Sequence, residues 1–142
     1  MDITFNIEDN SGVILRHLGE RVHKSMYAAA LTSQKHIVDY MSKPDFTGND
    51  IVDTGRLRAS ISFIAKDKQG KGMHISKNSQ PMDTITGLTA ANEAIIGSNV
   101  EYAAYVNNGT TKQPPRRFME HGILDNKTDI QAIITDVIKG VR

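Results

Sequence analysis

Asp53-Thr54-Gly55 is the part of the sequence whose residue types most suggest catalysis. Two such carboxylates, one from each of two identical subunits, would share a proton and activate a water molecule. The chemistry would then be peptide hydrolysis by a dimer. An aspartic-type protease is therefore the hypothesis to consider if the chain is an enzyme.

The residues around this tripeptide resemble aspartic proteases only in part. Ile95-Ile96-Gly97 is similar to the apolar segment that supports the catalytic loop in the retroviral enzymes. Arg56, however, stands where that family has a small residue, and its guanidinium would pair with Asp53 and keep the carboxylate charged. A permanent anion cannot alternate as acid and base. We instead predict a structural turn, with Asp53 as its helix cap, made of Asp53, Thr54, Gly55, Arg56, Leu57 and Arg58.

Two other groups of residues could carry chemistry, the histidines and a short basic loop. The histidines include no pair at i and i+4 and the chain has no cysteine, so they do not predict a zinc site. The basic loop, Lys112–Arg117, could contact phosphate, but a short charge run is usually solvated. Phosphate-binding glycine loops, dinucleotide fingerprints and nucleophile elbows are not found in the sequence. We expect no catalysis, cofactor or metal.

The composition predicts one ordinary domain over residues 1–142. Of these residues 39% are hydrophobic, which is enough for a single core. The 17 basic and 16 acidic residues nearly cancel, so no overall field favours nucleic acid or an anionic membrane. The sequence has no cysteine, no secretory signal and no apolar stretch of the ~20 residues that span a bilayer. We expect a protein made in the cytoplasm, with no membrane partner and no specific nucleic-acid partner.

A long amphipathic helix should open the domain. Asn10 or Ser11 can cap it, and it should end before Pro44, because the residue before a proline is pushed out of the helical region. Apolar residues recur at spacings of three and four along it. The predicted apolar stripe comprises Leu15, Leu18, Val22, Met26, Ala29, Ile37 and Tyr40.

Shorter elements follow the long helix. Alternation predicts strands at 3–7 and 61–65, and a further strand should end at Gly97. Residues 100–108 have helical spacing, with Gly109 as the C-terminal cap. Residues 66–92 hold several lysines and glycines with little periodicity, which favours a mobile hairpin arm or loop.

A second amphipathic helix should close the chain. It runs from about Ile123 to Val141, and Thr128 and Gln131 have the spacing of a capping box. Strands and helices do not alternate, which favours an α+β domain over a parallel sheet. The predicted fold is an antiparallel sheet packed against the long N-terminal helix, with a shorter C-terminal helix and a long flexible hairpin arm.

Three segments, taken in order, resemble one family. They are VDTGRLRASI at 52–61, AIIGSNVEYAAYVNNGT at 94–110 and PPRRF at 114–118. The resembled family is the tail-component or neck family of siphophages, the gene-product-ten-like head-tail joining proteins. Its pattern is a D-T-G-x-L-R-x-S-I run, a variable arm, a G-x-x-x-x-Y-A-x-Y-x-E-x-G-T run, an R-P-F turn and a closing helix. This chain departs from it at Asn107, commonly Glu, and at Arg117, commonly Pro.

The resemblance implies a structural virion protein without catalysis or cofactor. Such proteins form a ring between the portal side of the head and the tail tube of a long-tailed phage or prophage. The implied partners are further copies of the chain, as a hexamer or a dodecamer, and other connector and tail proteins. The implied location is the head-tail junction of the virion, after synthesis in the host cytoplasm. A DNA-contacting accessory protein, binding through the basic loop, is the remaining alternative.

The segment from Tyr102 to Phe118 is the predicted contact with a neighbouring subunit or tail protein. Tyrosines three residues apart on a short helix present large amphipathic surfaces, and paired prolines would hold the following loop extended. The alternative is that Tyr102 and Phe118 close the core while the arginines are solvated. The predicted interface residues are Tyr102, Tyr105, Asn107, Gly109, Thr110, Pro115, Arg116, Arg117 and Phe118.

Overall fold

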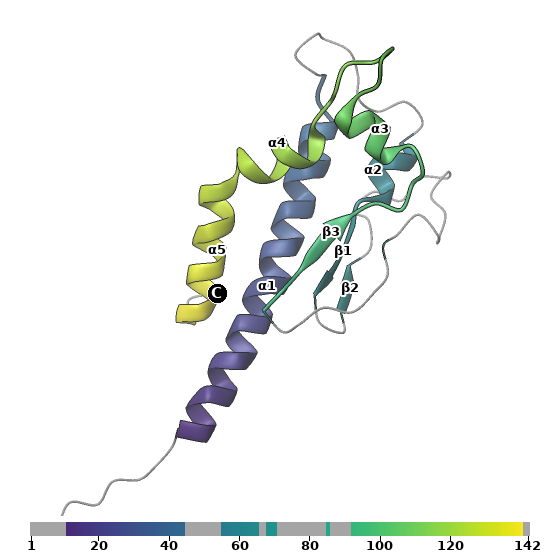
Figure 1. The fold of residues 1–142 in the computed structure, drawn as a ribbon. Helices are drawn as coiled ribbons and strands as arrows, with labels where there is room; N and C mark the ends of the chain where they lie inside the picture. Colours follow the sequence, from purple (N-terminus) through teal and green to yellow (C-terminus); the bar gives the residue numbers. More distant parts are fainter. Residues whose placement is uncertain (1–10, 45–54, 66–67, 71–84, 86–91, 141–142) are drawn as a thin grey trace, which may run out of the picture.

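The computed structural model of the chain describes residues 11–44, 55–65, 68–70, 85 and 92–140 (Figure 1). Its longest element is helix α1, Ser11–Met41, which has 31 residues and a length of about 45 Å. The predictions of a long N-terminal helix and of its end before Pro44 are confirmed. The strand predicted at 3–7 lies outside the described residues.

A small antiparallel sheet lies against α1 (Figure 1). Its strands are β1, Ser62–Ala65, β2, Lys68–Gly70, and β3, Ile95–Gly97, in the order β2-β1-β3. Phe63 of β1 pairs with Gly70 on one side and with Ile96 on the other. Its ring meets that of Tyr27 on α1 edge to face, with centroids 5.3 Å apart. A mostly helical chain with a small antiparallel sheet against its long N-terminal helix is compatible with the predicted α+β class.

Strand β1 is buried on both faces, although its sequence alternates. Ser62 is fully buried, and its hydroxyl accepts a hydrogen bond of 3.0 Å from the backbone N–H of Ile85. At the start of the strand, the Gln34 amide of α1 donates to the Ile61 carbonyl at 2.6 Å. These bonds satisfy polar groups that would otherwise be costly to bury.

Part of the range expected to form a long arm is integrated into the domain. Lys68–Gly70 forms β2, which pairs antiparallel with β1, and Ile85 is buried. Strand β2 binds the β1 backbone, and the N–H of Ile85 donates to the Ser62 hydroxyl, so both parts of the range contact the rest of the domain. The remainder of the predicted arm, up to residue 91, lies outside the described residues.

The described residues include four further helices. They are α2, Arg56–Ser60, α3, Ala103–Asn108, α4, Phe118–Leu124, and α5, Lys127–Lys139. The predictions of a helix ending at Gly109 and of a terminal helix hold in outline. The predicted capping box is wrong, because Asn126 occupies the N-cap position of α5 and the Asn126 amide instead donates to the Gly122 carbonyl at 3.0 Å.

Helices α4 and α5 pack along α1 (Figure 1). A hydrogen bond of 2.7 Å joins the His36 ring of α1 to the carboxylate of Asp129 in the first turn of α5. At the other end of α5, the Arg21 guanidinium donates to the Ile138 carbonyl at 3.3 Å. Helix α5 is thus antiparallel to α1 and covers it between about residues 21 and 36.

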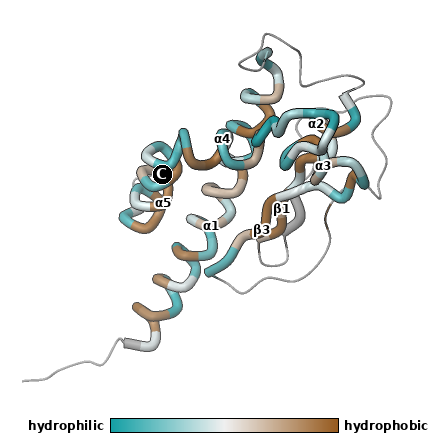
Figure 2. Tube along the Cα trace, turned by 45° about the horizontal axis from the view of Figure 1, so that its top comes forward, coloured by the Kyte–Doolittle hydropathy of each residue, from teal (hydrophilic) through white to brown (hydrophobic). Residues whose placement is uncertain are grey.

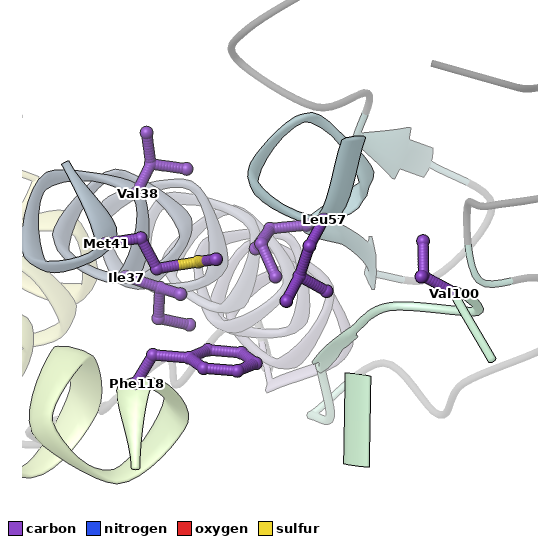
Figure 3. Close-up of a cluster of buried hydrophobic side chains, with 7 residues drawn as sticks. Ile37, Val38, Met41, Leu57, Val100 and Phe118 are labelled. Carbon is purple, nitrogen blue, oxygen red and sulfur yellow. The ribbon is translucent and has the colours of Figure 1, made fainter. Parts of the chain in front are cut away.

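The main core lies at the C-terminal end of α1. Figure 3 shows Leu57 and Phe118 directed toward Ile37 and Met41 of α1. The members of this cluster are Ile37, Val38, Met41, Leu57, Ile61, Val100 and Phe118.

The first turns of α1 extend beyond the rest of the domain. Every residue from Gly12 to Arg21 is exposed, and Figure 2 shows apolar residues in these turns. Ile14 is 62% exposed and Leu15 is 67% exposed. The predicted apolar stripe is therefore buried only in its later part, because α5 ends beside Arg21 and leaves Leu15 and Leu18 uncovered.

Candidate assembly surface

The candidate surface consists of α3 and the loop that joins it to α4. Gly109 ends α3 with a φ of 79°, and its N–H donates to the Tyr105 carbonyl at 2.9 Å. A Cβ on Gly109 would lie 2.6 Å from the backbone nitrogen of Pro115. Only glycine fits, because the position needs both a positive φ and room for the returning loop. The chain thus leaves α3 at Gly109, turns between Thr110 and Gln113, and returns past Gly109 at Pro115.

Hydrogen bonds fix the loop on α3. Thr110 and Gln113 exchange backbone hydrogen bonds of 2.8 and 3.3 Å, and the Thr110 hydroxyl accepts two more from the N–H groups of Lys112 and Gln113. The returning strand of the loop is held by Arg116, whose N–H donates to the Val106 carbonyl at 3.0 Å. A loop held in this way loses little conformational entropy when a partner binds.

Arg117 adopts a left-handed conformation, with a φ of 48°, at the N-cap position of α4. Its N–H donates to the Asn107 carbonyl at 3.0 Å, and its own carbonyl accepts from the N–H of His121 at 3.0 Å. Proline, which the resembled family commonly has here, has a fixed negative φ and no N–H. Arg117 therefore allows a positive φ and a backbone hydrogen bond that a proline at this position would exclude.

Asn107 caps α4 with its side chain, because the Arg117 side chain at the N-cap position makes no capping hydrogen bond. The Asn107 side-chain oxygen accepts a hydrogen bond of 3.1 Å from the N–H of Met119, in the first turn of α4. Its amide nitrogen donates to the Glu120 carboxylate at 3.3 Å. Because these bonds lie within one subunit, Asn107 acts first as a structural link between α3 and α4.

We expect Asn107→Ala to lower the free energy of unfolding by about 1 kcal/mol, the usual cost of losing a helix cap. Urea unfolding followed by circular dichroism would measure the change. The exposed Asn92 provides a control with the same side chain, and Asn92→Ala should change stability by less than about 0.5 kcal/mol. Equal losses in the two variants would contradict the capping role.

The two large aromatic residues at the ends of the predicted interface do not belong to its surface. Phe118 is 1% exposed and lies in the core, so it cannot contact a partner, and its inclusion was wrong. Tyr102 is half-buried against the same core, and the Arg56 guanidinium lies 5.9 Å from its ring centroid. Tyr102 packs the start of α3, and Phe118 the start of α4, against the core.

The remaining predicted residues differ in exposure. Tyr105 on α3 is 63% exposed. Thr110 and Arg117, at the two ends of the loop that follows α3, are exposed as well. Gly109, Pro115 and Arg116 are half-buried, and the Tyr40 hydroxyl lies 3.5 Å from the Arg116 carbonyl as a weak hydrogen bond. The surface available to a partner is thus Tyr105, the loop 110–114 and Arg117.

The predicted structural turn is described from Gly55 onward. Gly55, with a φ of 80°, occupies the N-cap position of α2. The cap predicted at Asp53 falls on a residue that the structure does not describe. Leu57 is buried in the main core, and the Arg58 guanidinium donates to the Ser42 hydroxyl at 3.1 Å. Asp53 and Thr54 lie outside the described residues, and Ile95–Gly97 pairs with β1 as strand β3.

Among the described residues, no three His, Asp or Glu side chains gather in a way that could hold a metal ion. His36 and His121 each contact a carboxylate, of Asp129 and Asp125 respectively. In the same part of the chain, no helix combines the length and the apolar character needed to cross a membrane. No family model, curated protein or solved structure matches the chain.

Proposed function

We propose that the chain is a structural subunit of the head-tail junction of a long-tailed phage or prophage. In this proposal it forms a homo-oligomeric ring that joins connector proteins of the head to proteins of the tail, and it is located in the virion. Binding and assembly are its activities. The proposal extends to the undescribed part of 66–92, which would act as an arm that contacts a neighbour.

The observation that carries the proposal is the convergence of the three family-like segments. Leu57 comes from the first, Val100 from the second and Phe118 from the third, and all three pack in one core cluster with the end of α1 (Figure 3). A single chance match would have no reason to meet the others in space. The convergence supports the interpretation of the three segments as parts of one fold signature.

The same cluster is the base of the exposed loop. Phe118 and Tyr102 pack α4 and α3 against it, and the loop between these helices presents Tyr105 and Arg117 to solvent. Tyrosine and arginine are enriched among residues that dominate binding energy. Because the loop is already ordered by hydrogen bonds, a partner would bind it without the entropy loss of ordering it first.

We expect the double variant Tyr105→Ala with Arg117→Ala to reduce head-tail joining about tenfold or more, since truncating a hot-spot residue, a class in which tyrosine and arginine are enriched, costs about 2 kcal/mol or more. The variant would be supplied in trans to a phage that lacks the gene, and joined particles would be counted by electron microscopy.

The control for this experiment is Leu31→Ala, which removes an apolar side chain that is 43% exposed on α1, away from the loop. It should leave joining unchanged. Melting temperatures of both variants would exclude loss of fold as the cause. If the double variant joined heads and tails normally, Tyr105 and Arg117 would not be part of the contact, and this prediction would be wrong.

A further inference from the structure

The first turns of α1 carry an unusual concentration of exposed apolar side chains. We call the segment 12–24 the α1 tip. The structure shows eight large hydrophobic residues as exposed among those it describes, and four of them are in the tip. These are Val13 at 46%, Ile14 at 62%, Leu15 at 67% and Leu18 at 45%.

The tip is exposed because its partner helix is too short. Helix α5 ends beside Arg21, where the guanidinium contacts the Ile138 carbonyl. A Cβ added at Gly12 or at Gly19 would meet no neighbouring atom within 4 Å, so the helix backbone there is open to close approach by another chain. Ile14, Leu15, Leu18 and Val22 fall on one side of the helix, and the apolar side of an amphipathic helix normally faces another surface. The tip thus has the character of a surface that another chain covers.

A second exposed surface lies at the corner between α4 and α5. We call residues 118–130 the α4–α5 corner. Leu124 is 64% exposed at its apex, with exposed carboxylates at Glu120 and Asp125. Three carboxylates, Glu120, Asp125 and Asp129, against the single cation Lys127 give this corner a formal charge of −2.

The charge of the α1 tip is opposite. Its cations Arg16, Arg21 and Lys24 outnumber the one carboxylate, Glu20, so the formal charge with neutral histidines is +2. Pairing two tips with each other would bring like charges together, whereas pairing a tip with a corner brings opposite charges together. Both surfaces also present a large exposed leucine.

We propose that the α1 tip of one copy docks on the α4–α5 corner of a second copy. Within one chain the two surfaces cannot meet, because Leu15 and His36, which marks the start of α5, are about 30 Å apart along α1. A contact between two different surfaces is heterologous, and a contact of this kind builds a ring when its rotation closes after a whole number of copies. The inference deepens the proposed function, because it rests on self-assembly and names the surfaces that join the copies.

Site-specific disulfide formation tests this contact directly, because the chain contains no cysteine. Leu15→Cys and Leu124→Cys would be purified separately, mixed and exposed to mild oxidation. We expect covalent dimers that contain one chain of each variant, at a yield several-fold above that of a control mixture. The control pairs Leu31→Cys, also exposed on α1, with Leu124→Cys. The chain that carries both Leu15→Cys and Leu124→Cys should form a ladder of dimers, trimers and larger species.

Two outcomes would overturn the proposal. Dimers of Leu15→Cys alone, at a higher yield than the mixed dimers, would show that tips pair with tips. Mixed dimers no more abundant than in the Leu31→Cys control, including the case of a chain that stays monomeric, would show that the tip does not bind the corner. The junction function has a separate readout in particle joining, so a ladder without joining, or joining without a ladder, identifies which of the two has failed.

Discussion

Replacing Gly122 with alanine should lower the free energy of unfolding by about 1–3 kcal/mol, the typical cost of adding volume to a well-packed interior. Gly122 is buried in α4 at the crossing with α1. A Cβ there would lie 2.5 Å from Cγ1 and 2.7 Å from Cα of Ile37. Backbone atoms cannot move aside as a flexible side chain can, so the two helices would have to separate. Thermal and urea unfolding of the purified subunit would measure the loss.

Gly19→Ala provides the matched control, since it makes the same chemical change in a helix with open surroundings. No neighbouring atom lies within 4 Å of the added carbon at Gly19. Alanine is favoured over glycine in a helix interior, so this variant should gain about 0.5–1 kcal/mol. Opposite signs for the two substitutions would support the close packing of α1 and α4. A neutral or stabilising Gly122→Ala would contradict that packing.

Elements whose pattern is local were predictable from the sequence. The length of α1 follows from its uninterrupted apolar spacing and from Pro44, and the end of α3 follows from Gly109. Strand β3 was also expected to end at Gly97. In each case one strong local signal, a proline, a glycine or a regular period, agrees with the tertiary structure.

Elements that depend on a distant partner were not predictable. Lys68-Gln69-Gly70 contains no residue that favours strands, and it becomes β2 because the backbone of β1 offers a free edge. The break between α4 and α5 has no glycine or proline to signal it. There the Asn126 side chain binds the Gly122 carbonyl, and a new helix begins at Lys127.

The candidate surface was predicted in position but not in detail. The sequence left open whether Phe118 joins Tyr105 at the interface or closes the core. The structure exposes Tyr105 at 63% and leaves Phe118 only 1% exposed, because α4 turns Phe118 toward Ile37. The capping role of Asn107 was missed because its acceptor oxygen binds Met119, twelve residues away, on a different helix.

Removal of the gene from the phage or prophage genome that carries it tests the central claim most directly. Electron microscopy of the lysate should show filled heads and complete tails that are not joined, because the proposed ring is the connection between them. The wild-type gene supplied in trans should restore joined particles and infectivity. Joined, infective particles in the lysate of the deletion would contradict the account.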